Sequence, residues 1–88
     1  MSFNLYIVEA RDFLVKINAL DEDHEIKIRM LDEEYTLLKK FLKTNETDKI
    51  KHQIYDMLFI LFEISAMYNL DLDTEWNNSQ EKKKKYYK

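Results

Sequence analysis

The chain contains no glycine and no proline in its 88 residues, although these two residue types together make up about 12% of an average protein. β-Sheets need tight hairpin turns, and the commonest of these turns are built on glycine or Asn-Gly. Glycine-rich phosphate-binding loops, such as the Rossmann and P-loop motifs, are excluded for the same reason. The absence of both residue types therefore favours an all-α fold.

The composition indicates a folded, single-domain protein. With 45% hydrophobic and 14% aromatic residues, most of the chain can bury a core and is not disordered, and its length suits one domain. Because it has no cysteine, disulfides, thiol nucleophiles and cysteine-ligated zinc are excluded. The longest apolar run, residues 57–62, is far shorter than the roughly 18 residues that span a bilayer, and the start lacks the features of a signal peptide. We expect a cytoplasmic protein without a membrane partner.

Charged residues are distributed unevenly along the chain. Residues 1–79 carry 9 Lys or Arg against 16 Asp or Glu, whereas residues 80–88 carry 5 against 1. An acidic body argues against specific binding of nucleic acid. We expect one helical domain over residues 1–80 and a basic C-terminal tail over residues 81–88 that frays.

Apolar residues recur with a helical period in four segments. In the first, apolar positions fall at offsets of 0, 4, 7, 11 and 14 from Phe3. Asp21–Asp23 interrupts that stripe and supplies an N-cap for a second helix over residues 22–43. A further helix is expected from about residue 73, with Trp76 as a core or dimer contact. The expected core side of the second helix comprises Met30, Leu31, Leu37, Leu38, Phe41 and Leu42.

The third helix is expected over residues 48–69, with Thr47 as its N-cap. Its apolar residues occur on every side: Ile54, Met57, Leu58, Phe59, Ile60, Leu61, Phe62 and Ile64. A helix that is apolar all round must be buried all round, and four helices in so short a chain cannot surround one of their own members. We therefore expect a homodimer in which a second copy covers part of this helix.

Two carboxylates lie on faces that are otherwise expected to be buried. Glu34 stands between Leu31 and Leu38 at helical spacing, and Asp56 shares a stripe of the third helix with Gln53. An unpaired carboxylate on an apolar face costs several kcal/mol, so each needs a cation, a hydrogen-bond donor or a proton. The alternatives are a structural contact at a helix crossing and a Mg²⁺ site built from facing helices.

The same two carboxylates lie in recognisable segments. Residues 31–38 read LDEEYTLL and residues 53–59 read QIYDMLF. These segments resemble the LxEExxEL and ExxDxLY segments of the MazG-like nucleotide pyrophosphohydrolases. Residues 64–73 are similar to the family's stretch that ends in a Gly-Ile-Asp-Leu-like turn, with Asn69 in place of the glycine. The resemblance covers about residues 26–88.

The resemblance implies a four-helix MazG-like bundle completed across a homodimer or a dimer of dimers. Members of that family bind Mg²⁺ through an ExxE and an ExxD motif. They cleave nucleoside triphosphates between the α- and β-phosphates, releasing a monophosphate and pyrophosphate.

Only two of the four ligand positions that the resemblance implies keep a carboxylate. Glu34 matches the first Glu of ExxE and Asp56 matches the Asp of ExxD, while Leu37 and Gln53 replace the other two ligands. A leucine cannot bind a metal, and two carboxylates make a poor site for Mg²⁺. The candidates for auxiliary ligands are Glu33, Gln53 and Glu63. Both glutamates are expected to face solvent.

The expected contacts to a nucleotide are also weak. Ser79 and Lys83 stand where the family often has a Lys and an Asn that contact the substrate, so neither position matches. His52 and Lys83 remain as nucleotide-binding candidates, with a plain surface role as the alternative for His52. The run of lysines at 82–85 is either solvated or a contact for nucleotide or RNA phosphates.

These departures favour a catalytically degenerate MazG-like protein that acts as a dimeric binding or regulatory module. Its expected partners are a second copy and a nucleotide or another protein, and no cofactor is expected. In the remaining acidic cleft, Glu34 and Asp56 are expected to be hydrogen-bonded to Gln53 and Tyr35. The alternative is a working Mg²⁺-dependent nucleoside triphosphate pyrophosphohydrolase, in which Mg²⁺ is the cofactor.

Overall fold

The computed structural model describes residues 2–87, which form helices and contain no strand. The elements are α1 (Phe3–Lys16), α2 (His24–Lys43), α3 (Thr47–Met67), α4 (Leu72–Lys83) and a 3-10 turn, η1 (Lys84–Tyr86). The expected all-α class is therefore confirmed. None of the helices in this part of the chain has the length and apolar character needed to cross a bilayer.

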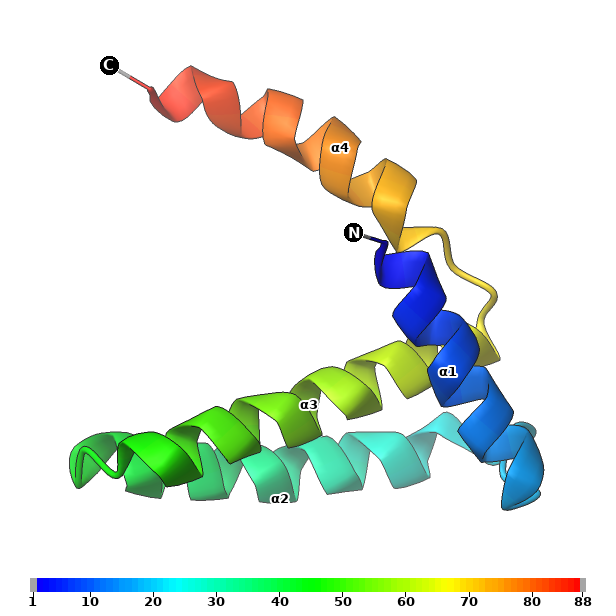
Figure 1. Cartoon of the computed structure of the whole chain (residues 1–88), viewed down its shortest axis with the longest axis horizontal. Helices are drawn as coiled ribbons and strands as arrows, with labels where there is room; N and C mark the ends of the chain where they lie inside the picture. Colours follow the sequence, from blue (N-terminus) through cyan, green and yellow to red (C-terminus); the bar gives the residue numbers. More distant parts are fainter. Residues whose placement is uncertain (1, 88) are drawn as a thin grey trace.

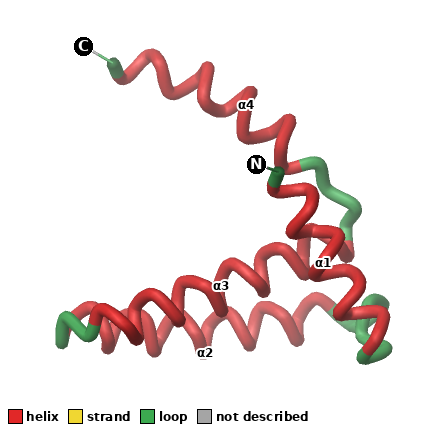
Figure 2. Tube along the Cα trace, viewed as in Figure 1, coloured by secondary structure: helices red, strands yellow, loops and turns green. Residues whose placement is uncertain are grey.

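The helices form an open arrangement rather than a closed bundle (Figure 1). α2 and α3 lie side by side as an antiparallel hairpin, and α1 crosses the C-terminal half of α3. α4 starts beside the N-terminal end of α1 and extends away from the hairpin, and short connections join all four helices (Figure 2). Within residues 2–87, therefore, α3 packs mainly against α1 and α2.

At the ends of three helices, asparagine occupies the left-handed position that is usually glycine. Asn18, Asn45 and Asn69 have φ angles of 57°, 54° and 54°, the left-handed region that asparagine tolerates better than most residues. After α3, Asn69 N–H donates to the carbonyl of Ala66 and Leu70 N–H to that of Ser65. The same pair of bonds follows α1 and α2, so each helix ends in a Schellman motif.

The helix starts agree only partly with the expected caps. Asp23 caps α2 by accepting a hydrogen bond from Glu25 N–H, as expected, and the helix begins at His24. The expected N-cap role of Thr47 is wrong, because Thr47 is already the first helical residue and Glu46 occupies the cap position. Glu46 N–H donates to the Phe41 carbonyl in the Schellman motif that ends α2. Glu46 is therefore the last residue before α3, and α3 starts one residue earlier than expected, at Thr47.

The core is small and lies where α1 meets the C-terminal end of α3. It is formed by Ile7, Leu14, Ala19 and Ala66, with Leu20, Phe62, Met67 and Leu72 packed against it. In α2, Lys27 is buried, while Met30, Leu37 and Leu42 are exposed. Their expected place in the core is wrong for one chain, because α2 packs against α3 alone.

Helical conformation continues through Lys83, and the turn η1 follows it. That residues 81–88 fray stays a prediction. Trp76, expected as a core or dimer contact, is 55% exposed and packs against Phe3, with a centroid distance of 5.1 Å and the rings tilted by 54°. It is therefore not part of the core of one chain.

Candidate functional site

The carboxylates singled out in the sequence meet at one cavity of about 570 Å³ between α1, α2 and α3. Its acidic lining residues are Glu9, Glu34, Asp56 and Glu63. The other residues that line it are apolar or aromatic, and no lysine or arginine is among them. We call this the carboxylate cavity. Sequence reasoning missed Glu9, because nothing in the pattern of α1 shows that this helix crosses α3.

Gln53 is buried and bonds directly to Glu34. Its side-chain Nε2 donates to the backbone carbonyl of Glu34 at 2.9 Å and also to the Glu34 carboxylate. The expected Gln53–Glu34 hydrogen bond is thereby confirmed. The amide turns its donor side toward Glu34, so it satisfies this carboxylate in place of a cation.

Asp56 pairs with a residue one helical turn earlier. Its Oδ2 lies 3.2 Å from His52 Nε2 on the same face of α3. His52 is exposed, which agrees with the alternative that it is a plain surface residue. The expected contact with Tyr35 is wrong, because Tyr35 is exposed on α2 with Lys39 lying 4.9 Å over its ring.

Glu63 is buried, and its expected exposure to solvent is wrong. Its Oε2 lies 3.3 Å from Lys27 Nζ, and each side chain is only 3% exposed. Burial raises the pKa of Glu63, and the charge of Lys27 opposes that rise. Lys27 could have been found, because it precedes Leu31 by four residues and Glu34 by seven on the face expected to be buried.

The other candidates lie outside this cavity. Glu33 and Leu37 are exposed on α2. Ser79 bonds to Glu75 within α4, and Lys83 is the last residue of α4, a helix that extends away from the hairpin (Figure 1). One chain therefore does not bring Lys83 and the carboxylates together.

The residues present do not fit the Mg²⁺ site that the resemblance implies. At the four ligand positions, Leu37 has no donor atom and Gln53 directs its N–H groups at Glu34. Among residues 2–87, no three His, Asp or Glu side chains are grouped so that they could hold one metal ion.

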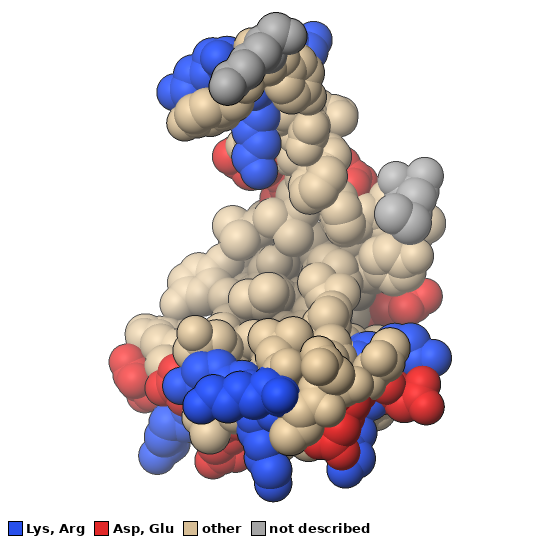
Figure 3. All heavy atoms as spheres, turned by 90° about the vertical axis from the view of Figure 1, so that its left-hand side faces the viewer, with Lys and Arg blue, Asp and Glu red and all other residues tan. Residues whose placement is uncertain are grey.

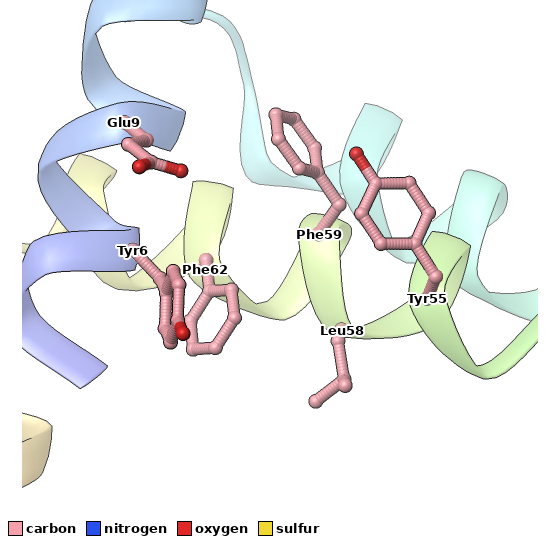
Figure 4. A pocket seen from close by; sticks show the side chains of 6 residues that line it. All are labelled: Tyr6, Glu9, Tyr55, Leu58, Phe59 and Phe62. Atoms are coloured by element: carbon pink, nitrogen blue, oxygen red, sulfur yellow. The ribbon is translucent and has the colours of Figure 1, made fainter. Parts of the chain in front are cut away.

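A second cavity, of about 340 Å³, adjoins the first and is lined by Tyr6, Glu9, Tyr55, Leu58, Phe59 and Phe62. We call it the aromatic cavity. The Tyr6 and Phe62 rings lie together on one side, those of Tyr55 and Phe59 on the other, and the Glu9 carboxylate points toward the space between (Figure 4). Glu9, Tyr55 and Phe59 line both cavities.

One apolar stripe of α3 stays partly exposed in the structure of residues 2–87. Ile54, Leu58 and Leu61 follow one another at helical spacing and are 46%, 43% and 44% exposed. Leu58 also lines the aromatic cavity, together with Tyr6 and Glu9 of α1. We call these three residues the open stripe.

Comparison of the sequence with models of protein families and with curated proteins, and of the structure with solved structures, finds no match.

Proposed function

We propose that this protein is a homodimeric binding or regulatory module on a MazG-like scaffold, without Mg²⁺-dependent hydrolysis. The observation that carries the proposal is the bond from the Gln53 amide to the Glu34 carboxylate. A neutral amide stands at one ligand position and donates a hydrogen bond to the carboxylate at another. A divalent ion would have to break this part-buried hydrogen bond to bind there.

The pairing of the other carboxylates supports the same conclusion. Three of the candidate carboxylates have a partner within the protein, namely Gln53 for Glu34, His52 for Asp56 and Lys27 for Glu63. Hydrogen bonds and ion pairs of this kind stabilise a carboxylate without a metal. The carboxylate cavity can therefore be stable, and can bind a ligand, without a metal ion.

The open stripe supports the homodimer. Exposed apolar surface of this kind, continuous along a helix, is typical of an interaction site. Covering it with the same stripe of a second copy buries both at once in a two-fold arrangement. We propose that α3 of both copies lies at the centre of the dimer.

Calorimetry with Mg²⁺ tests the loss of the metal site. We expect the unmodified protein to bind Mg²⁺ no more tightly than in the millimolar range. The variant Gln53→Glu should bind at least about tenfold more tightly, because it places a second carboxylate beside Glu34. Leu42→Glu, which adds a charge to an exposed position of α2 outside the cavity, is the control and should change nothing. Micromolar binding by the unmodified protein would overturn the proposal.

One observation favours the alternative function: four carboxylates from three helices line a single cavity. If the protein is a Mg²⁺-dependent pyrophosphohydrolase, a panel of nucleoside triphosphates with Mg²⁺ or Mn²⁺ should yield monophosphate and pyrophosphate at catalytic rates. The activity should disappear in Asp56→Ala and persist in Asp12→Ala, an exposed change on α1. Such a result would replace the proposal above.

A further inference from the structure

In residues 2–87, three of the four lysines near the C-terminus have no counter-ion. Residues 82–85 are four consecutive exposed lysines, which we call the lysine segment. Lys84 pairs with Glu81 at 2.9 Å. In the described part of the chain, Lys82, Lys83 and Lys85 form no ion pair. Adjacent like charges repel one another, so this segment gains from any site that supplies carboxylates.

The carboxylate cavity has the complementary chemistry. Glu9, which lines both cavities, makes no hydrogen bond or ion pair with residues 2–87, and beside it the rings of Tyr55 and Phe59 face the shared space. A lysine ammonium is attracted both by carboxylates and by the faces of aromatic rings. This chain already places Lys39 4.9 Å and Lys49 5.5 Å over aromatic rings.

The position of α4 indicates that its partner is another copy. Within residues 2–87, α4 contacts its own chain mainly through its first turns, where Leu72 packs against the core, Asp73 bonds to Ser2 and Trp76 lies beside Phe3. A twelve-residue helix is marginal in water unless it packs on something. Figure 3 shows the lysines at the end of α4 and, between them and the end of the hairpin, a surface that is mostly uncharged on the face displayed. A second copy can cover that surface with its own open stripe.

We propose that the lysine segment of one copy docks at the carboxylate cavity of the other, with ammonium groups beside Glu9, Glu34 and Asp56. The inference rests on the dimer of the proposed function and deepens it. In a two-fold dimer each copy donates its segment and receives the other. The docked lysines occupy the place of any cationic ligand, so release of the segment opens the cavity and docking closes it.

Cross-linking between distinguishable copies tests the contact. Unlabelled and isotope-labelled protein are mixed, and a zero-length carbodiimide joins lysines to carboxylates that touch. We expect peptides of mixed isotope content that link residues 82–85 to Glu9, Glu34 or Asp56. Links that join these residues only within one copy, or lysine links only to other carboxylates, would overturn the inference.

Sedimentation at low salt measures how much the docked lysine segment contributes to dimer affinity. The triple variant K82Q/K83Q/K85Q should raise the dimer dissociation constant about tenfold and reduce its salt dependence. The control K39Q/K40Q/K43Q makes the same change of charge at exposed positions of α2 and should leave the constant nearly unchanged. Equal effects of the two variants would show that net charge alone is responsible and would overturn the docking.

The outcomes separate this inference from the function on which it rests. A stable dimer without cross-links at the cavity overturns the docking and leaves the binding module standing. Tight Mg²⁺ binding overturns the module and leaves the cross-links standing. If added spermidine protects the cavity carboxylates from the carbodiimide while the lysine segment remains unlinked, the occupant is an external cation and the inference is wrong.

Discussion

The pair between Lys27 and Glu63 places two opposite charges in the interior, where each side chain is 3% exposed. Removing both charges from water costs several kcal/mol per ion, and their attraction recovers only part of that cost. The raised pKa of Glu63, caused first by burial and only partly offset by Lys27, shows the same imbalance. The pair therefore specifies how α2 lies on α3 more than it stabilises the fold.

At this residue scale we predict that Lys27→Met lowers the free energy of unfolding by about 3 kcal/mol, because it leaves Glu63 buried without a partner. Urea denaturation followed by circular dichroism, at one fixed protein concentration, measures the effect. The double variant Lys27→Met with Glu63→Met should recover most of the loss. If Lys27→Met alone were as stable as the unmodified protein, Glu63 would have to be accessible to water, which would contradict the prediction.

At the scale of elements, the first turns of α1 and α4 cap each other. The Asp73 carboxylate accepts hydrogen bonds from Ser2 Oγ at 2.6 Å and Phe3 N–H at 2.7 Å. In return, the Asn4 side-chain oxygen accepts from Leu72 N–H at 3.0 Å. Unpaired N–H groups at helix starts favour such acceptors and negative charge. This reciprocal capping is what attaches α4 to the rest of the chain.

Acid should detach α4. The hydrogen bond from Asn4, with those from Thr74, lowers the pKa of Asp71 from 3.8 to about 2, and the bond from Ser2 lowers the pKa of Asp73. The unfolded state then binds more protons than the folded state. The stabilisation is present above pH 3.8 and is lost as the pH falls toward 2. Fluorescence of Trp76, which packs against Phe3, reports the change.

The matched variants for this acid transition are Asp73→Asn and Asp12→Asn. We expect the fluorescence change below pH 3.8 to be much smaller in Asp73→Asn, because that variant cannot lose the carboxylate on protonation. Asp12 is exposed on α1 and its variant should titrate like the unmodified protein. Identical curves for all three proteins would contradict the capping role of Asp73.

At the scale of the whole molecule, a substitution on the open stripe can test association without unfolding the monomer. Ile60 belongs to the interior of one chain, being 4% exposed, so a charge there would unfold the monomer. Leu58→Asp places the charge on the open stripe instead. We predict that it raises the dimer dissociation constant by at least about 100-fold, because an unpaired carboxylate enters the interface. Sedimentation measures this constant, and circular dichroism should show an unchanged helix content.

The control for the open stripe is Val15→Asp. Val15 is 56% exposed near the end of α1, which lies away from the open side of the molecule (Figure 1). This variant makes the same chemical change and should leave the dissociation constant within about twofold. A well-folded monomer of the unmodified protein at micromolar concentration would contradict the dimer itself.

The local properties of this protein could be read from its sequence. The absence of glycine and proline and the helical spacing of apolar residues predicted the all-α class, because both depend on the conformation of neighbouring residues. Asp23 was recognisable as a cap for the same reason. The contact between Gln53 and Glu34 was also accessible, since two helices joined by a short turn run antiparallel and bring positions on either side of that turn together.

Only the tertiary structure decided which residues from distant segments meet. Glu9 reaches the carboxylate cavity because α1 crosses α3, and Glu63 is buried because Lys27 approaches it from another helix. The start of α3 at Thr47 followed from the left-handed Asn45 that precedes it. Crossing positions and contacts of this kind depend on how whole helix faces fit together, and helical period alone does not specify that fit.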